Sequence, residues 1–273
     1  MNNNRAVLVA FAADPYLALY FKKTYDLFWK NEVDESHIHI NGKQKFIIDF
    51  IEKLWQKDAK QIIKRYWVYR QGEAFNELYP QINCDTLITM DSDNFIYRKG
   101  VINKFANMVE SGEYDYVGSR HPFMSFWNKS VLDKIEVDFE EHHYKSGKFY
   151  DVMELLNIRF AEKTDKLFEI PFDNLPAYEH IGRRSFFSHW VSDYPKEKEI
   201  PERNILKALG KINRAAYTYY IFQQTKKDFP FKEYNDYYEK MFIKTINYLG
   251  FNLRNLAYSI DKKVKVRLPK ELI

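Results

Sequence analysis

Short apolar runs alternate with helix-like segments through the first half of the chain. The runs are rich in β-branched and aromatic residues, whereas the segments between them repeat apolar residues at three- and four-residue spacing. This alternation is typical of an α/β sheet whose strands are joined by covering helices. The predicted strands are residues 6–11, 37–40, 65–69, 86–90, 114–118 and 167–171, and the predicted helices are residues 17–30, 45–57, 73–79, 100–110, 123–134 and 150–163.

The strand signals disappear after residue 200, and helices are predicted over residues 205–224 and 234–248. We therefore predict a main α/β domain over residues 1–200 and a C-terminal helical extension with a basic tail over residues 201–273. No stretch reaches the roughly 18–20 apolar residues that a membrane span needs, and the first strand is too short for a secretion signal. The single cysteine, Cys84, excludes an internal disulfide and indicates a reducing compartment, so the predicted location is cytoplasmic.

The net charge of +4 is too small to demand a nucleic acid or a membrane as partner. Basic side chains nevertheless gather in two places. These are the tail 261–273, with Lys262, Lys263, Lys265, Arg267 and Lys270 against two acids, and a group formed by Arg183, Arg184, Lys207, Lys211 and Arg214. A solvated surface is the usual explanation, and the alternative is a site for a polyanion or for lipid head groups. Peripheral membrane contact through the tail thus stays open.

Two carboxylates, Asp91 and Asp93, flank Ser92 directly after the predicted strand 86–90. Strand side chains alternate between faces, so both acids point the same way if the strand persists. Where the strand ends, both can converge on one hard cation that also carries phosphate oxygens. The alternative is an ordinary turn, with Asp91 in an Asx-turn beside Asn94. We favour a divalent ion that bridges a nucleotide diphosphate.

Four stretches appear in a characteristic order. They are the strand 7–11, the stretch 69–76 with its Gly-x-x-x-Asn pattern, the strand 87–93 with Asp-x-Asp, and the His-x-Gly loop 180–185. Their order and spacing resemble the GT-A class of nucleotide-sugar glycosyltransferases, particularly the large family that contains bacterial and phage glycan-modifying enzymes. The resemblance covers roughly residues 5–190 and implies a Rossmann-like, mixed central sheet flanked by helices. The chain departs from the pattern after the second strand, where Asn41-Gly42 replaces the acidic pair of many relatives.

The resemblance implies a donor site for a nucleotide-diphosphate sugar and Mn²⁺ or Mg²⁺. The implied metal ligands are Asp93, His180 and, through water, Asp91; the implied nucleotide contacts are Phe11, Asn41, Arg70, Gly72, Asn76, Asp91 and Ser92. Carboxylate oxygens suit both ions, and Mn²⁺ also accepts an imidazole. An ordinary surface position is the alternative for His180, a plain turn for Gly72 and a helix-surface amide for Asn76.

An inverting transferase needs a base that deprotonates the acceptor hydroxyl. Asp151 stands where many members of the resembled family carry an acid at the start of a helix, and Glu154 is the reserve candidate. The alternative for Asp151 is an N-cap of the helix predicted over residues 150–163. The sequence leaves inversion and retention both open.

The predicted function is a metal-dependent glycosyltransferase that moves a sugar from a nucleotide-diphosphate sugar to an acceptor hydroxyl, with a surface glycan as the expected acceptor. One alternative is a phage-type glycosyltransferase that acts on modified, hydroxylated DNA bases. Another class, a nucleotidyltransferase, would favour a glycine-rich loop after the first strand, where Ala12-Ala13-Asp14-Pro15 has no glycine. A non-catalytic nucleotide-sugar-binding protein is the remaining alternative.

Overall fold

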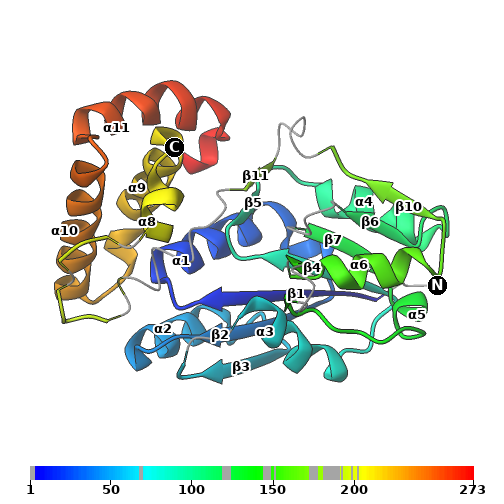
Figure 1. Cartoon of the computed structure of the whole chain (residues 1–273). Coiled ribbons are helices and arrows are strands. Elements are labelled where there is room, and N and C mark those ends of the chain that lie inside the picture. The colour runs from blue at the N-terminus through cyan, green and yellow to red at the C-terminus, as the bar shows by residue number, and fades with distance from the viewer. Residues whose placement is uncertain are drawn as a thin grey trace.

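A computed structural model describes residues 4–67, 70–118, 124–143, 149–150, 152–171, 178–180, 191, 193–197, 199–201 and 203–273. A seven-stranded sheet with the order β10-β6-β7-β4-β1-β2-β3 forms its centre (Figure 1). Its strands are β1 (Arg5–Ala12), β2 (Glu35–Asn41), β3 (Gln61–Arg65), β4 (Thr86–Asp91), β6 (Tyr116–Gly118), β7 (Met124–Asn128) and β10 (Leu167–Glu169). Strands β3, β2, β1 and β4 are parallel, whereas β7 runs antiparallel to β4 and β6. This mixed sheet confirms the predicted α/β class.

Helices cover both faces of the sheet because the strand side chains alternate. In β1, Val7, Val9 and Phe11 join one hydrophobic cluster, whereas Ala6 and Leu8 join a second cluster on the opposite face. The first cluster takes side chains from α1 (Pro15–Thr24), its π-helical continuation (Tyr25–Trp29), α2 (Lys45–Trp55) and α4 (Val101–Glu110); the second takes them from α3 (Gln71–Leu78), α5 (Lys129–Leu132) and α6 (Glu154–Ala161). Short 3₁₀ turns follow at Lys30–Glu32 and Tyr79–Gln81.

Three predicted elements are wrong in type or place. The strand predicted over 65–69 ends at Arg65 and occupies 61–65, because β3 is an edge strand and the aromatic residues after it are exposed. The helix predicted over 123–134 is β7 followed by α5. Strand β7 lies between β4 and β6 and is buried on both faces, so its apolar run resembles a helix pattern. The His-x-Gly loop predicted over 180–185 starts at a residue that is still in a strand, because β11 ends at His180; the rest of this loop lies outside the described residues.

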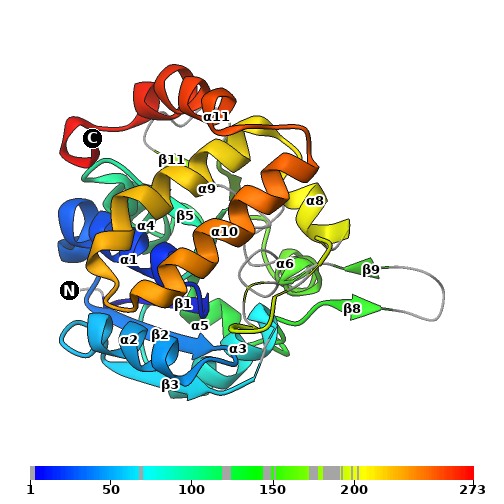
Figure 2. The ribbon, with the colours of Figure 1, turned by 90° about the vertical axis from the view of Figure 1, so that its left-hand side faces the viewer.

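Two small antiparallel pairs complete the strands. One joins β5 (Asn94–Ile96) to β11 (Tyr178–His180), and the other joins β8 (His142–His143) to β9 (Phe149–Tyr150). The β8–β9 pair projects from the body of the molecule in Figure 2. The β5–β11 pair instead lies beside the end of β4, because β5 follows β4 after a two-residue turn.

The described residues after 201 form a helical unit. It contains α8 (Arg203–Leu209), α9 (Ile212–Thr225), α10 (Lys232–Tyr248) and α11 (Leu253–Ser259), with a π-helical turn at Ile260–Val264 and 3₁₀ turns at Lys226–Asp228, Lys265–Arg267 and Lys270–Leu272. The predicted helix 205–224 is thus divided at Gly210, while the helix predicted over 234–248 is confirmed as α10. Within the described residues, no helix has the length and hydropathy that a bilayer crossing requires.

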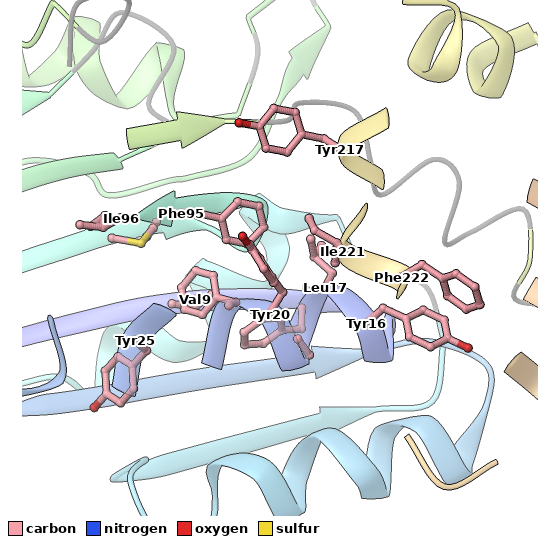
Figure 3. Close-up of a cluster of buried hydrophobic side chains, with 14 of the residues drawn as sticks. Val9, Tyr16, Leu17, Tyr20, Tyr25, Phe95, Ile96, Tyr217, Ile221 and Phe222 are labelled. Carbon is pink, nitrogen blue, oxygen red and sulfur yellow. The ribbon is translucent and has the colours of Figure 1, made fainter. Parts of the chain in front are cut away.

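Tyr16 of α1 connects this helical unit to the sheet. Its buried ring lies edge-on to Phe222 and Tyr238, with centroid distances of 4.9 and 4.5 Å. Its hydroxyl donates a 2.6 Å hydrogen bond to Asn235 Oδ1 on α10. Figure 3 shows Tyr16 beside Phe222, with Tyr20 and Phe95 nearer the sheet. Aromatic contacts therefore join the helical unit and the sheet in one hydrophobic cluster.

Candidate functional site

The carboxyl ends of the parallel strands meet at one edge of the sheet. Backbone register pairs Ala12 of β1 with Asn41 of β2, Asn41 with Arg65 of β3, and Ala10 of β1 with Asp91 of β4. In Figure 1 this edge faces the C-terminal helical unit. Open α/β sheets bind ligands outside the carboxyl ends of their strands. The predicted nucleotide and metal residues of these strands therefore share the edge at which a ligand is expected.

The two acids lie on a tight turn at this edge. Asp91 is the last residue of β4, Ser92 and Asp93 form the turn, and Asn94 begins β5. Asp93 is 9% exposed and Asp91 is half-buried. The two carboxylates therefore do not lie on one continuous strand, and strand alternation does not place them on the same side. Whether both reach one ligand depends on the geometry of the turn.

Gln71, the first residue of α3, was not singled out from the sequence. Its side-chain amide donates a hydrogen bond to Asp91 Oδ1. The amide is a neutral donor, so it orients the carboxylate without neutralising its charge. Because the sequence placed the start of this helix at residue 73, no local signal pointed to Gln71 as a neighbour of Asp91.

His180 returns to the acidic turn through its backbone. Strand β11 pairs antiparallel with β5, and His180 stands opposite Asn94, the residue that follows Asp93. A segment some ninety residues away in sequence is thereby held beside the turn. The imidazole of His180, the Arg183 and Arg184 side chains and the whole of Asp151 lie outside the described residues, so their roles stay predictions.

Arg70 occupies the N-cap position of α3. Its backbone N–H donates a 2.9 Å hydrogen bond to the Glu73 carboxylate, which satisfies one of the free amides at the helix start. The Arg70 guanidinium pairs with Glu141, and its side chain is 62% exposed. The predicted contact between Arg70 and a diphosphate would require this exposed ion pair to open.

Gly72 and Asn76 hold the chain's own segment 138–140 against α3. A Cβ at Gly72 would stand 2.4 Å from Phe139 O and 2.5 Å from Glu140 Cα. Asn76 donates from Nδ2 to Asp138 at 2.8 Å and to Glu140 at 3.2 Å, and its Oδ1 accepts from Phe139 N at 3.0 Å. The protein's own backbone at residues 139–140 therefore occupies the space beside Gly72.

These bonds also set the charge of Asp138. Burial alone would raise the pKa of its carboxyl, but hydrogen bonds from Asn76 and from the Glu140 backbone outweigh burial and lower it. His142 Nε2 lies 2.9 Å from the same carboxylate. An ionised Asp138 thus ties α3 to the base of the β8–β9 pair, just before Asp151 in the sequence.

The prediction for Phe11 needs correction at the level of its side chain. The ring is 1% exposed and packs against Phe21 and Trp55, with centroid distances of 5.3 and 5.8 Å. Only its backbone lies at the sheet edge, because residue 11 of β1 points into the first hydrophobic cluster. Asn41 ends β2 and is also buried, with 2% exposure, so its contact with a nucleotide stays a prediction.

The sequence comparisons find no matching protein-family model and no matching curated protein. Solved structures do resemble it. A mannosyltransferase, PcManGT from Pyrobaculum calidifontis, in complex with GDP-Man and Mn²⁺, aligns with a TM-score of 0.50 and 9% identity over 100% of this chain and 82% of that chain. The chain has the GT-A fold. The predicted resemblance is thereby confirmed for the fold, which is all that such low identity shows.

Two further solved structures align with lower scores. S. aureus TarS 1-349, in complex with UDP-GlcNAc, has a TM-score of 0.49 and 11% identity over 96% of this chain and 88% of that chain. Glucosyl-3-phosphoglycerate synthase from Mycobacterium tuberculosis, in complex with Mn²⁺, UDP and glucosyl-3-phosphoglycerate, has a TM-score of 0.48 and 12% identity over 77% of this chain and 81% of that chain.

In this GT-A sheet the helix that follows β1 does not offer its N-terminus to a phosphate. Asp14 caps α1, and its Oδ1 accepts from Tyr16 N at 3.0 Å and from Leu17 N at 2.9 Å. The carboxylate, 2% exposed, occupies the place that an anion takes in a phosphate-binding loop. The first amides of α1 are therefore already bound by a side chain of the protein itself.

The N-cap alternative for Asp151 is wrong. Helix α6 begins at Glu154, and Met153 holds its N-cap position with a φ of 62°. Glu154, the reserve base, is half-buried in the first turn of α6. Position 151 therefore precedes the N-cap residue of α6 by two residues in the sequence.

The side chains at this edge offer oxygen donors for a divalent cation. Among the side chains that the structure describes, no three His, Cys, Asp or Glu residues gather into a metal cluster. The described donors are the carboxylates of Asp91 and Asp93, and the His180 backbone lies beside their turn. Carboxylate oxygens are ligands that Mn²⁺ and Mg²⁺ prefer, and Mn²⁺ also accepts an imidazole. The donor set therefore fits the cation.

Proposed function

We propose that this protein is a divalent-metal-dependent glycosyltransferase that uses a nucleotide-diphosphate sugar. The observation that carries the proposal is the Asp91–Asp93 turn at the carboxyl edge of a GT-A sheet, with the His180 backbone paired beside it. PcManGT, which shares the fold, is described in complex with GDP-Man and Mn²⁺. The Asp14 cap of α1 adds support. Because Asp14 already accepts hydrogen bonds from the first amides of α1, the charge of a diphosphate would be neutralised at the acidic turn.

In this proposal Asp93 and His180 bind Mn²⁺ or Mg²⁺, and Asp91 takes part through water or contacts the ribose. The bound cation would neutralise the charge that grows on the leaving diphosphate. Gln71 supports the site by fixing the orientation of the Asp91 carboxylate. Low exposure of Asp93 strengthens its attraction for a cation, since less water screens the carboxylate.

The nucleotide is proposed to lie along the ends of β1 and β2. There the Asn41 amide would contact the nucleotide, where many relatives have acidic residues. At residue 11 the contact would come from the backbone, because the Phe11 ring is buried. Ser92 sits in the acidic turn, and Arg70 reaches the diphosphate when its pair with Glu141 opens. Gly72 and Asn76 act indirectly, by holding segment 138–140 against α3.

Asp151 is proposed as the base that accepts the proton of the acceptor hydroxyl. In the sequence it follows β9 and stands two residues before Met153, the N-cap residue of α6. Glu154 in the first turn of α6 is the second candidate. Single Asp151→Asn and Glu154→Gln variants distinguish the two candidates. The base is the residue whose substitution abolishes sugar transfer while donor binding persists.

We infer a glycan as the acceptor and the cytoplasm as the location. The glycan follows from the proposed chemistry of the GT-A class, and Cys84 supports a reducing compartment. Burial raises the pKa of the Cys84 thiol to about 12, so it stays protonated and unreactive. Product analysis with glycan and hydroxylated-DNA acceptors tests the acceptor directly.

The experiment that tests the proposal is thermal stabilisation by UDP-, GDP-, CMP- and dTDP-linked sugars with and without Mn²⁺, followed by measurement of sugar release. We expect one donor class to stabilise the protein only when Mn²⁺ is present, because the cation links the phosphates to the acids. Asp93→Asn should lower the metal-dependent kcat/KM by on the order of 100-fold or more.

Asp165→Asn is the matched control, since this exposed acid precedes β10 at the opposite edge of the sheet. Full metal-dependent turnover by Asp93→Asn would refute the proposed role of the turn. Release of pyrophosphate from nucleoside triphosphates would indicate a nucleotidyltransferase instead. Donor binding without any turnover of sugar or nucleotide would indicate a binding protein.

A further inference from the structure

The net charge of this chain is concentrated at one end of the helical unit. Residues 248–273 contain six basic side chains and two acidic ones, a net charge of +4 that equals the formal net charge of the whole chain. The preceding 247 residues are therefore formally neutral. One of the two acids, Asp261, is paired with Lys265 at 2.8 Å, which leaves Lys262 and Lys263 as an exposed adjacent pair of cations.

This basic segment is also amphipathic. The helical stretch from α11 to the 3₁₀ turn at Lys265–Arg267 buries Leu256, Val264 and Leu268, and α11 packs along α9. Between these buried residues, Arg254, Tyr258, Lys262 and Val266 recur at four-residue intervals, and all four are exposed. We call these four residues, together with the exposed neighbours Leu253 and Lys263, the α11 face.

The α11 face exposes apolar as well as charged side chains. Tyr258 is 69% exposed and Val266 is 75% exposed, and Leu253 at the start of α11 is 42% exposed. Figures 1 and 2 show α11 at the outer end of the helical unit, away from the strands. Burying exposed apolar side chains lowers the free energy. A partner that covers the α11 face would therefore gain both apolar contact and charge pairing.

The composition of the α11 face identifies the chemistry of that partner. A second copy of the chain would bring the same patch against itself in a two-fold dimer, and like charges would then oppose each other. Nucleic acid would pair with the lysines but would leave Val266 and Leu253 unburied. An anionic lipid surface satisfies both, because head groups pair with Lys and Arg, aliphatic side chains enter the acyl boundary, and Tyr lies at the interface.

We propose that the α11 face binds the surface of an anionic membrane as a peripheral contact, with the helical axis along the plane of the bilayer. The proposal is independent of the transferase assignment, since it rests on charge and exposure at residues 253–267. The same helical unit faces the carboxyl edge of the sheet in Figure 1, so membrane binding would bring the candidate site near the lipid surface.

Co-sedimentation of the full chain with phosphatidylcholine vesicles, with and without phosphatidylglycerol, tests the proposal. We expect binding to the vesicles that contain phosphatidylglycerol, weakening with added salt because charge pairing is screened. Lys262→Gln/Lys263→Gln should lower the partition coefficient by about thirtyfold. Tyr258→Ser should lower it by about tenfold, including in high salt, where apolar contact dominates.

Lys57→Gln/Lys134→Gln is the matched control, because these exposed lysines lie on the sheet domain and the substitution changes the net charge equally. Melting curves of all variants check that each one folds. Equal binding by the Lys262/Lys263 variant and the control would overturn the proposal, as would equal binding to neutral and anionic vesicles. Binding of duplex DNA but not of vesicles would assign the face to nucleic acid, and dimerisation that depends on Tyr258 would assign it to a second copy.

Discussion

The stability of this protein should fall in mild acid because of His39. This β2 side chain is 0% exposed, and its Nε2 lies 3.0 Å from the Glu77 carboxylate. The same carboxylate pairs with Arg65, so its charge is already balanced. Burial lowers the pKa of His39 to about 4, and the positive charge of Arg65 acts in the same direction. His39 therefore folds as a neutral imidazole.

The sign and size of the effect follow from proton binding. An unfolded chain protonates this histidine near pH 6.5, whereas the folded protein does so only near pH 4. Between these values the unfolded state holds the extra proton, so the free energy of unfolding falls as the pH falls. The loss amounts to about 2 kcal/mol by about pH 5 and to about 3 kcal/mol in full, and stability above about pH 6.5 is unaffected by this group.

Urea unfolding of the wild type and of His39→Gln, followed by tryptophan fluorescence between about pH 7.5 and pH 5, measures this contribution. Glutamine keeps a hydrogen-bonding side chain beside Glu77 but does not titrate. The difference in unfolding free energy between the two proteins should shift by about 2 kcal/mol in favour of the variant over this range. Parallel pH dependences for the two proteins would refute the reasoning, since they would show that His39 does not remain neutral in the folded state.

Three further substitutions test contacts around the site. Gly72→Ala should cost about 1–3 kcal/mol in urea unfolding, because the new methyl group collides with the backbone at Phe139; an unchanged midpoint would show that segment 138–140 moves freely. Asp14→Ala should cost about 1–2 kcal/mol through loss of the α1 cap, and Asp14→Asn should restore most of it. Gln71→Ala should lower metal-dependent kcat/KM by about tenfold with little change in melting temperature, because Asp91 loses its orienting amide; unchanged kinetics would remove Gln71 from the site.

The central sheet was largely predictable from the sequence. Strands β1 and β4 carry largely apolar runs, β2 alternates isoleucine with histidine, and the helices between them have one apolar face, so periodicity located these elements. The position of Asp91 at the end of a buried strand was local information as well. That His180 lies near this end came from the order of motifs, and the β5–β11 pairing agrees with it for the backbone.

The tertiary structure decided the elements whose patterns are ambiguous. The apolar run of residues 124–128 became a strand because β4 and β6 offer hydrogen bonds on both sides, a fact that no local window contains. Which face Phe11 points to, and which backbone fills the space beside Gly72, depend on neighbours far away in sequence.

The sequence by itself determined where strands and helices recur, that two acids follow a buried strand, and that positive charge gathers in the last residues. Only the tertiary structure decided that Gln71 bonds Asp91, that Asn76 holds segment 138–140, and that the basic segment exposes Tyr258 and Val266. The physical reason is that periodicity reports how each segment divides its side chains between water and core. Periodicity carries no information about which distant segment packs against a given apolar face, which one provides a hydrogen-bond partner, or which side chains of a segment no other segment covers.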